Sequence, residues 1–304
     1  MRNKNILLLF FVCAFRCVVV AQVNHPAFRY VSSDSVVACA SERYQAHSFL
    51  RSVFMGKNYR SAWAQPVTLP VFRLSQTTYR IIELGGGMQT KSLKLEDSQG
   101  RTWALRTIDK DVAGAMPPLL KNSFAQKLTQ DQISAAMPYG VVVIGPLARS
   151  AGIAAAQPTV FFVADDTALG PYRSIFANSV CMLEERDPGF ETTIDTETLL
   201  RKIQKENSTV VDQKALLKAR LLDILIADWD RHFDNWRWGS RDSAGLHYFE
   251  AIPRDRDWAF YASNGFVPKL MRLVALRFLI NFRDKPRHIK NLSLKAHIFD
   301  GVFL

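Results

Sequence analysis

The chain of 304 residues has few features that would place it outside the ordinary globular proteins. Its four cysteines are too few for a disulfide framework, and its 15 glycines and 13 prolines are too few for a fibrous or low-complexity class. The sequence shows no internal repeat and no low-complexity linker. With 48% hydrophobic residues, the chain can bury a substantial core in one large domain or in two lobes.

The chain also lacks a dense cluster of basic residues, although its net charge is +11. Such a charge suits an anionic partner such as nucleic acid, lipid headgroups or phosphorylated ligands. However, Lys and Arg are spread thinly along the chain, and no recognisable nucleic-acid module is present. The sequence therefore argues against nucleic-acid binding and favours a generally basic exported protein.

Residues 1–21 have the anatomy of a secretory signal. Arg2 and Lys4 precede the apolar run ILLLFFVCAF, and small residues follow at the expected cleavage positions. Arg16 interrupts the apolar run, which weakens a membrane-spanning interpretation, because a spanning helix needs about 20 apolar residues. We therefore expect an exported protein, periplasmic or associated with the outer membrane or cell surface. An uncleaved anchor stays open.

Two of the cysteines lie within this signal and would leave with it. Cys39 and Cys181 remain in the rest of the chain. They can form a disulfide in an oxidising compartment or stay as free thiols, and the sequence does not choose between these states.

After an N-terminal extension at 22–59, the chain divides into a sheet-rich and a helix-rich part. The runs PVTLPVFRL, RIIELGGG, SLKLED and TWALRTI predict an antiparallel sheet, with the turn DSQG between the last two. The change comes near 186–195. These patterns predict an α+β chain of two lobes, one at about 60–184 and one at about 185–304.

Helical spacing of apolar residues predicts helices at Ala38–Met55, Leu119–Ala136, Thr196–Glu206 and Val211–Trp229. In the last of these, the spacing predicts an apolar face, with the basic residues turned away from it. The predicted face of this last helix consists of Leu217, Leu221, Ile224 and Leu225, and the basic residues turned away are Lys214, Lys218 and Arg220.

Two other stretches, VVVIGPLA and PTVFFVADD, are typical of buried strands or short connections.

Gly85, Gly86 and Gly87 follow a β-like run. Residues without Cβ let backbone amides approach a phosphate closely, so the triplet is a candidate phosphate-binding loop. Such triplets are more often plain tight turns or bulges, so the signal is weak by itself. It is not a Walker loop, because the spacing to Lys91 and Ser92 is wrong and no helix follows.

The most informative stretch runs from Leu221 to Phe260. An apolar run ends in DWDRHFDN, and a second acidic segment, PRDRD, follows one predicted strand later. A kinase-type site needs one carboxylate to orient or deprotonate the acceptor hydroxyl, and an amide oxygen with a second carboxylate to hold Mg²⁺. The offset from Asp230 to Asn235 matches the catalytic loop of protein kinases.

The motifs GGGMQTKSLKLED, WALRTIDKD, DQISAA, LLDILIADWDRHFDNWRW and IPRDRDWAF resemble the atypical protein-kinase-like superfamily, which includes the HipA, CotH, secretory-pathway and phosphatidylinositol kinases. Over about residues 56–304 they are most similar to an uncharacterised exported domain of Bacteroidetes type, found beside metallophosphoesterase or outer-membrane surface-antigen domains. The resemblance implies a two-lobed protein-kinase-like fold with a sheet-rich N-lobe and a helical C-lobe. It also implies binding of ATP or another nucleotide with Mg²⁺ or Mn²⁺.

The resemblance also assigns roles to single residues. Asp230 corresponds to the catalytic Asp and Asn235 to a metal ligand, while Asp255 or Asp257 supplies the second metal-binding carboxylate. Asp255 is preferred because Phe260 then falls at the offset of secretory-pathway kinases. The remaining residues are Arg231 and His232, expected to brace the loop; Arg106 and Lys110, expected at the phosphates; and Leu183 and Glu185, at the expected adenine-binding hinge near Leu183–Arg186.

The sequence departs from the family pattern in two places. Arg106 stands where the family has a phosphate-pairing Lys, and Arg is not an equivalent substitute. Its acidic partner is expected in the helix that follows, where Asp131 and Gln132 are both candidates. Few residues follow Asp257 for a complete helical lobe, so the chain can be a fragment of a longer protein.

The favoured function is phosphoryl transfer from a nucleotide to an unknown acceptor, which can be a protein, a lipid headgroup or a glycan. The first alternative is a catalytically silent pseudokinase or scaffold with an outer-membrane or cell-surface protein partner. The second is a metal-dependent phosphoesterase built on Asp230, His232, Asp255 and Asp257. A calcium loop fails because Phe233 replaces the required glycine.

Two aromatic or apolar stretches near this site also carry predictions. The three tryptophans of the central stretch are expected in the core rather than stacked on a substrate. These tryptophans are Trp229, Trp236 and Trp238. The segment Pro268–Phe282 mixes apolar residues with Lys269, Arg272 and Arg277, which predicts a helix, with a membrane-surface segment as the alternative.

Overall fold

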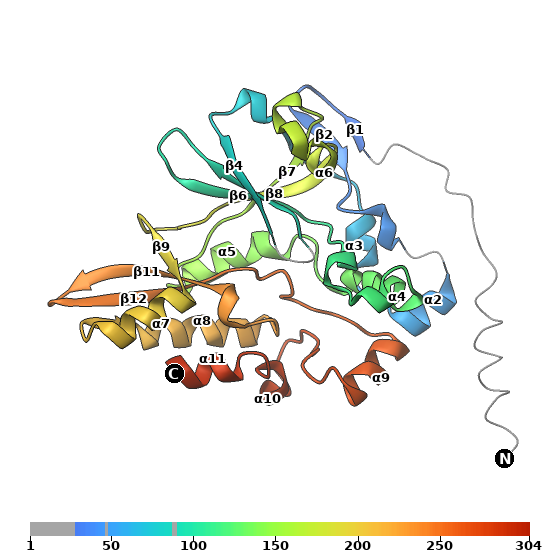
Figure 1. Cartoon of the computed structure of the whole chain (residues 1–304). Coiled ribbons are helices and arrows are strands. Elements are labelled where there is room, and N and C mark those ends of the chain that lie inside the picture. Colours follow the sequence, from blue (N-terminus) through green and yellow to red (C-terminus); the bar gives the residue numbers. More distant parts are fainter. Residues whose placement is uncertain (1–27, 46–47, 87–89) are drawn as a thin grey trace, which may run out of the picture.

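The computed structural model describes residues 28–45, 48–86 and 90–304. The predicted export signal at 1–21 and Gly87 lie outside these residues. The described chain is an α+β structure in which a large sheet stands above a helical region with a smaller sheet (Figure 1). The predicted α+β class, with a sheet-rich first part and a helix-rich second part, is confirmed.

The large sheet has eight strands in the order β1-β2-β3-β7-β8-β6-β5-β4. Neighbouring strands are antiparallel except β3 and β7, which are parallel. Two strands, β1 and β2, come from the predicted extension at 22–59 and join the sheet through β3. The strands are β1 (Phe28–Tyr30), β2 (Ser35–Ala38), β3 (Val67–Phe72), β4 (Arg80–Gly85), β5 (Ser92–Glu96), β6 (Thr102–Thr107), β7 (Thr159–Val163) and β8 (Ser179–Glu185).

Strand β8 pairs with β6 on one side and with β7 on the other, so it lies inside the sheet. Successive side chains of a strand point to opposite faces. Cys181 and Leu183 therefore join the buried cluster that contains Leu105 of β6, while Met182 and Glu184 line the opposite side together with Arg106. This alternation places two charged side chains beneath the sheet.

The smaller sheet has the order β10-β12-β11-β9. Its long hairpin turns at Ala244 and Gly245, both with positive φ (51° and 76°), between the paired residues Ser243 and Leu246. Two positive φ values in a two-residue loop match the twist of the strands that it joins. The strands are β9 (Thr193–Asp195), β10 (Thr209–Val211), β11 (Trp236–Ser243) and β12 (Leu246–Pro253).

Helix α8 lies beneath this smaller sheet (Figure 1). Its N-cap residue is Asp212, whose side chain accepts a hydrogen bond from the amide of Ala215 and so satisfies one free donor of the first turn. The helices are α2 (Phe49–Met55), α3 (Arg60–Ala64), α4 (Phe124–Gln132), α5 (Gly140–Ser150), α6 (Arg173–Phe176), α7 (Thr196–Lys205), α8 (Gln213–Leu225), α9 (Phe266–Val274), α10 (Ile289–Leu292) and α11 (His297–Phe303).

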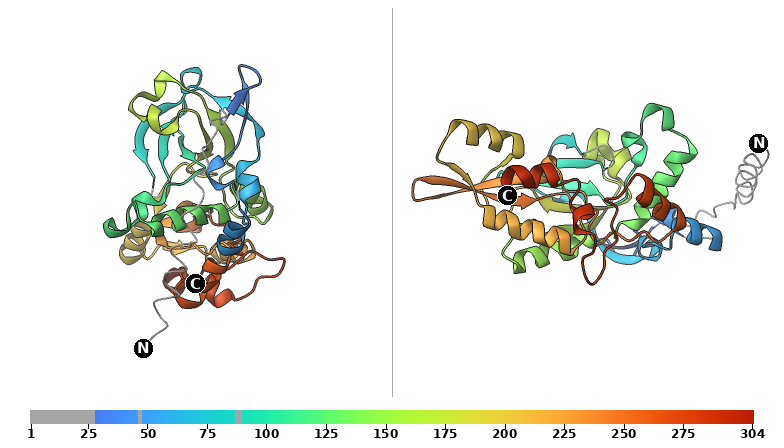
Figure 2. Two further views of the ribbon diagram at one scale, coloured as in Figure 1. Left: turned by 90° about the vertical axis from the view of Figure 1, so that its right-hand side faces the viewer. Right: turned by 90° about the horizontal axis from the view of Figure 1, so that it is seen from below.

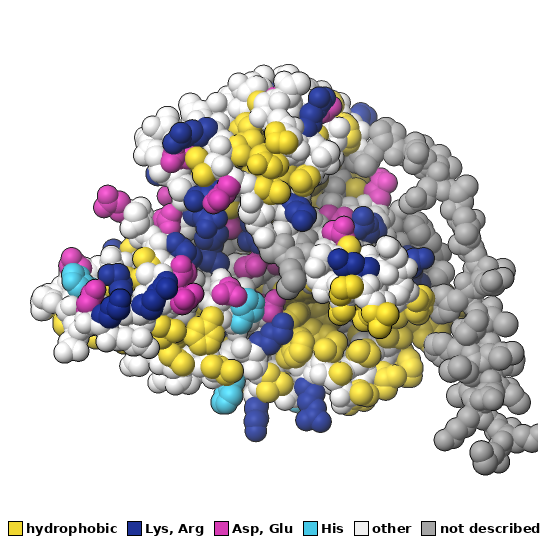
Figure 3. Space-filling view, in the orientation of Figure 1, with side chains coloured by type: hydrophobic (Ala, Val, Ile, Leu, Met, Phe, Trp, Pro, Cys, Tyr) yellow, Lys and Arg dark blue, Asp and Glu magenta, His cyan; other side chains and the backbone are white. Residues whose placement is uncertain are grey.

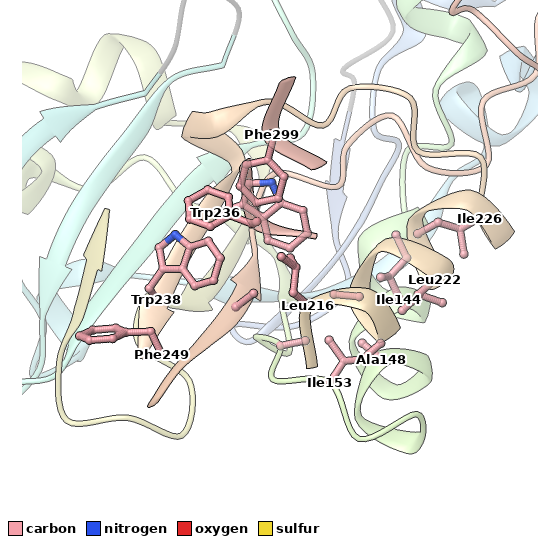
Figure 4. Close-up of a cluster of buried hydrophobic side chains, with 14 of the residues drawn as sticks. Ile144, Ala148, Ile153, Leu216, Leu222, Ile226, Trp236, Trp238, Phe249 and Phe299 are labelled. Atoms are coloured by element: carbon pink, nitrogen blue, oxygen red, sulfur yellow. The ribbon is translucent and has the colours of Figure 1, made fainter. Parts of the chain in front are cut away.

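The largest core cluster lies between the smaller sheet and helices α5, α8 and α11 (Figure 4). Trp236 stacks on Phe299 with ring centroids 4.8 Å apart, and Trp238 lies beside the same ring. Trp229 is also buried, in a neighbouring cluster with Tyr261. The prediction that the three tryptophans belong to the core is confirmed.

The predicted apolar face of α8 is wrong. Leu216, Ala219 and Leu222 are buried, whereas Leu217 and Leu221 are about half exposed. Leu216, Ala219 and Leu222 form one apolar stripe at helical spacing, and Leu217, Leu221 and Leu225 form another. Periodicity alone therefore did not decide which stripe faces the core. The buried stripe includes Arg220, whose charge is compensated by Asp223 and Asp300.

Three other element predictions need correction. VVVIGPLA, expected as a strand or connection, lies within helix α5, which continues through Pro146. The helix expected at Ala38–Met55 is confined to α2, and Ala38 ends a strand. The helix expected at Leu119–Ala136 is confined to α4 and a following single turn. Apolar β-branched runs do not distinguish a buried helix from a buried strand.

Cys39 and Cys181 are both buried and are not bonded to each other. Among the residues that the structure describes, no helix has the length and apolar character needed to span a membrane.

The burial pattern of α8 predicts unequal effects for two adjacent leucines. Leu216→Ala should lower the free energy of unfolding by about 2–5 kcal/mol, because it leaves a cavity in the core of Figure 4. Leu217→Ala should change it by less than about 0.5 kcal/mol, since that side chain is already half exposed. Urea denaturation of both variants measures the difference, and equal losses would contradict this packing of α8.

Candidate active site

The candidate site begins at Arg106, near the end of β6. Its guanidinium lies 2.5 Å from Asp255, 3.3 Å from Asp257 and 3.5 Å from Glu184 of β8. Only 11% of the Arg106 side chain is exposed. A buried guanidinium needs compensating carboxylates, and these come from β8 and from the segment that follows β12. The large sheet is thereby joined to the end of the smaller one.

Lys110 adds a second cation to the same cluster. Its ammonium lies 3.0 Å from Asp257 and 4.8 Å from the centre of the Trp258 ring, and both charged side chains are 8% exposed. Asp255, by contrast, is half exposed and has φ +57°, an uncommon conformation for a residue other than glycine. Backbone strain of this kind is often found at functional sites.

The two carboxylates have different electrostatic environments. Removal from solvent would raise the pKa of Asp255, but the adjacent Arg106 and Lys110 charges outweigh this effect and hold the pKa well below its usual value. Burial, together with the neighbouring Asp255 charge, raises the pKa of Asp257 despite the same two cations. Asp255 is therefore the fully ionised member of the pair and Asp257 the one that holds a proton more easily.

Asp230 lies in the loop after α8 and is held by a residue from near the end of the chain. The Lys295 ammonium is 2.7 Å from the Asp230 carboxylate. The same ammonium lies 4.7 Å from the ring centre of Trp229 and 4.8 Å from that of Phe278. Both rings contact the ammonium, so the position of Lys295 at Asp230 is specified by packing as well as by charge.

Arg231 connects the two acidic segments. Its side chain donates hydrogen bonds to the backbone carbonyl groups of Asn235 (2.9 Å) and Arg254 (2.6 Å). The amide of Arg254 also donates to the Asn235 carbonyl at 2.8 Å. Asn235 and the start of the PRDRD segment are therefore adjacent. The side-chain oxygen of Asn235 accepts a hydrogen bond from the amide of His232 at 3.1 Å, which closes the loop.

Asp223 anchors this loop from inside α8. The fully buried carboxylate contacts Arg220 at 3.0 Å, Arg231 at 3.4 Å and Arg256 at 2.8 Å. Arg220 and Asp223 therefore form an ion pair within α8. Because three cations share one buried carboxylate, the loop and the PRDRD segment are held against α8 at the same point.

The predicted helix partner of Arg106 is wrong. Asp131 forms ion pairs with Arg51 and Arg60 instead, and Gln132 accepts a hydrogen bond from Ser263. Helix α5, which also precedes β7, presents Val141, Ile144 and Gly145 to the space beside Arg106. The residues lining this space from α5 are apolar, so the acidic partners of Arg106 come from β8 and from beyond β12.

The glycine loop is described only in part. Gly86 has φ +107°, and a Cβ there would lie 2.3 Å from the carbonyl oxygen of Thr90, so glycine is required. Gly85 ends β4 and would accept a Cβ without a close contact. Gly87 lies outside the described residues.

Leu183 and Glu185, expected at the adenine-binding hinge, do not line the space beside Arg106. Leu183 belongs to the cluster on the opposite face of the sheet, and Glu185 ends β8 opposite Trp103. Glu184 lies between them and contacts Arg106 instead. The two glutamates that end this mostly apolar strand were a sequence signal for a charged contact. No sequence signal indicated Lys295, which is 65 residues from Asp230.

The space beside Arg106 is small. It is lined by residues of β6, α5, β8 and the PRDRD segment and has a volume of about 40 Å³. Typical ligand pockets have about 300–1,000 Å³. A larger cavity of about 380 Å³ lies at the end of β6 near Lys91, Asp109 and Lys110. A ligand at Arg106 therefore requires its contact with Asp255 to open.

The donor set of the site suits Mg²⁺ only together with a substrate. The described residues contain no group of three or more His, Cys, Asp or Glu that could hold a metal ion. Mg²⁺ at phosphate-transfer sites, however, is commonly bound by one or two carboxylates plus substrate phosphates and water. Asn235 and Asp255 lie on adjacent backbone and supply an amide oxygen and an ionised carboxylate, which fits this kind of site.

No protein-family model and no curated protein sequence matches the chain. Similar solved structures include the Helicobacter pylori proinflammatory kinase CtkA (10% identity over 68% of this chain and 67% of that chain, TM-score 0.33). They also include the Rio2 kinase of Chaetomium thermophilum, solved with ADP, Mg²⁺ and phosphoaspartate (12%, 73% and 66%, TM-score 0.36), and WaaP in complex with acyl carrier protein (11%, 73% and 85%, TM-score 0.29). The chain spans about two thirds of the first two structures.

Asp228, two residues before Asp230, predicts a pH dependence of stability. Burial, followed by the charges of Asp223 and Asp230, raises the pKa of Asp228 to about 7 in spite of Arg231. The folded chain then keeps a proton that the unfolded chain loses near pH 4. Stability should therefore fall as the pH rises from about 4 to about 7, and level off above that range.

Asp228→Asn removes this titration while keeping the shape of the side chain. The variant should match the wild type near pH 4 and exceed its unfolding free energy at pH 8, as measured by denaturant unfolding across this pH range. A constant loss of stability at every pH would instead mean that Asp228 is ionised and paired with Arg231.

Proposed function

We propose that the chain is an atypical kinase-like phosphotransferase that binds a nucleoside triphosphate, ATP in the first instance, with Mg²⁺ or Mn²⁺. The observation that carries this proposal is the contact of Arg106 with Asp255, beside Asn235. Arg106 is the cation beneath the strand pair next to the glycine loop. Its contact with Asp255 brings it to the carboxylate and the amide that the kinase pattern requires. These groups come from segments as far as 149 residues apart in the chain.

The proposal includes an exchange of partners on nucleotide binding. In the structure Arg106 and Lys110 neutralise Asp255 and Asp257. A phosphate chain would take the place of Asp255 at Arg106, whose planar group binds phosphate oxygens in pairs. Asp255 and Asn235 would then hold the metal ion. Bound Mg²⁺ neutralises charge that develops on the phosphate oxygens.

Asp230 is the proposed base. Its carboxylate orients the acceptor hydroxyl and takes its proton as the acceptor oxygen forms a bond to the terminal phosphorus. The bond from that phosphorus to the bridging oxygen breaks, and the nucleoside diphosphate leaves with the electron pair. Lys295 fixes the Asp230 carboxylate and supplies positive charge next to the reacting groups. The acceptor is a hydroxyl of a protein, a lipid headgroup or a glycan.

A catalytically silent scaffold is the second candidate. The observation that favours it is the small space of about 40 Å³ at Arg106, where every charged group already has a partner within the chain. In this case the ion pairs would have a structural role and the chain would act through a protein at the outer membrane or cell surface. For either function we propose an exported location, based on the signal anatomy of residues 1–21.

The catalytic role of Asp230 is tested with a matched substitution in the same loop. Asp230→Asn should reduce transfer of labelled phosphate from ATP, to the chain itself or to an added acceptor, by about 10²–10⁴-fold. Asp234→Asn should leave it unchanged, because the Asp234 side chain is 95% exposed. Absence of labelling by the wild type, with no thermal shift in ATP and MgCl₂, would contradict the proposal and support the scaffold.

The role of Lys295 is tested by removing its charge but keeping most of its stem. Lys295→Met should lower kcat by about 10- to 100-fold, since a hydrogen bond to a charged group is lost. The Met side chain still packs on Trp229 and Phe278, so the unfolding temperature should change little. Lys290→Met, at an exposed position of α10, is the control. A matching loss in the control, or unchanged kcat for Lys295→Met, would exclude this role.

A further inference from the structure

Helices α2 and α9 are distant in sequence but form one surface. Both views in Figure 2 show them next to each other, and in Figure 1 they lie at the lower right. The rings of Phe54 and Phe266 meet edge to face at 6.3 Å. At Gly265 the backbones approach so closely that a Cβ would lie 2.3 Å from the carbonyl carbon of Met55. The two helices are therefore held together by a contact that only glycine allows.

This pair of helices exposes a group of large apolar side chains that we call the apolar face. Phe49 is 82% exposed, Leu273 75% and Val274 73%. Figure 3 shows hydrophobic side chains gathered on this lower part of the molecule. Apolar surface of this kind marks an interaction site. The apolar face consists of Phe49, Leu50, Val53, Phe266, Leu270, Leu273 and Val274.

The segment that contains α9 is strongly basic. Helices α2 and α9 contain no Asp or Glu. Residues 266–290 contain seven Lys or Arg and one acidic residue, Asp284, so this segment carries about half of the net charge of the chain. The exposed basic residues are Lys269, Arg277, Arg283, Lys285, Arg287 and Lys290.

We propose that the apolar face and these basic residues bind the surface of a lipid bilayer that contains anionic headgroups. Apolar side chains from an amphipathic helix enter the boundary between headgroups and acyl chains, while Lys and Arg on its borders attract anionic lipids. A second copy of this chain is a poorer occupant, because a two-fold contact would bring the same positive segments together. The surface is separate from the Arg106 and Asp230 contacts, so this proposal does not depend on the proposed enzymatic function.

The experiment is flotation of the purified full-length chain with vesicles of 70% phosphatidylcholine and 30% phosphatidylglycerol, compared with vesicles of phosphatidylcholine alone. The wild type should float with the anionic vesicles and lose this binding at high salt. Leu273→Asp/Val274→Asp should weaken binding about tenfold or more, because two exposed apolar side chains no longer enter the membrane. Arg283→Gln/Lys285→Gln/Arg287→Gln should weaken it about 100-fold.

The matched control is Leu217→Asp/Leu221→Asp, which changes two half-exposed leucines on α8. It should float like the wild type. Because every variant carries the same residues 1–27, equal flotation of all of them would overturn the proposal and assign binding to another segment. Failure of the wild type to float, or equal binding to both kinds of vesicle, would also overturn it. So would a lipid-free dimer that dissociates in Leu273→Asp/Val274→Asp, which would assign the face to a second copy.

Discussion

The ion pairs of Arg106 with Asp255 and Asp257 are the interaction on which the arrangement of the two sheets depends. A guanidinium that is 11% exposed cannot be left without a counter-charge, and two of its three carboxylates belong to the segment beyond the smaller sheet. The large sheet, the PRDRD segment and, through Arg231, the loop after α8 are therefore held at one place. Asp257 also pairs with Lys110, so the charges at this place compensate one another as a group.

The same pairing explains why the candidate site is closed. Cations that would bind phosphate and carboxylates that would bind a metal ion satisfy one another, so little free volume remains beside Arg106. A site of this kind opens only for a ligand that can replace both partners, an anion for Arg106 and a cation for Asp255. A nucleotide with its divalent ion has both charges, which connects the electrostatics of the closed site to the proposed chemistry.

Sequence patterns predicted the α+β class, most strands and the helices at α7 and α8, because turn residues and apolar spacing are local properties. The predictions were wrong where two local arrangements fitted the sequence pattern equally well. The leucines of α8 form two stripes, and the run in α5 suits a strand as well as a helix. Burial against neighbouring elements decided both cases, and it also placed Arg220 inside with its carboxylate partners.

For the site, the sequence alone determined that Asp230 and Asn235 lie in one short segment and Asp255 and Asp257 in another, and the divalent-ion site stays a prediction from these spacings. Only the tertiary structure decided which charges meet. It replaced the expected helix partner of Arg106 by Glu184 and Asp255, and it brought Lys295 to Asp230. Ion pairs between distant segments depend on how the sheets and helices pack, and no local pattern in the chain records that packing.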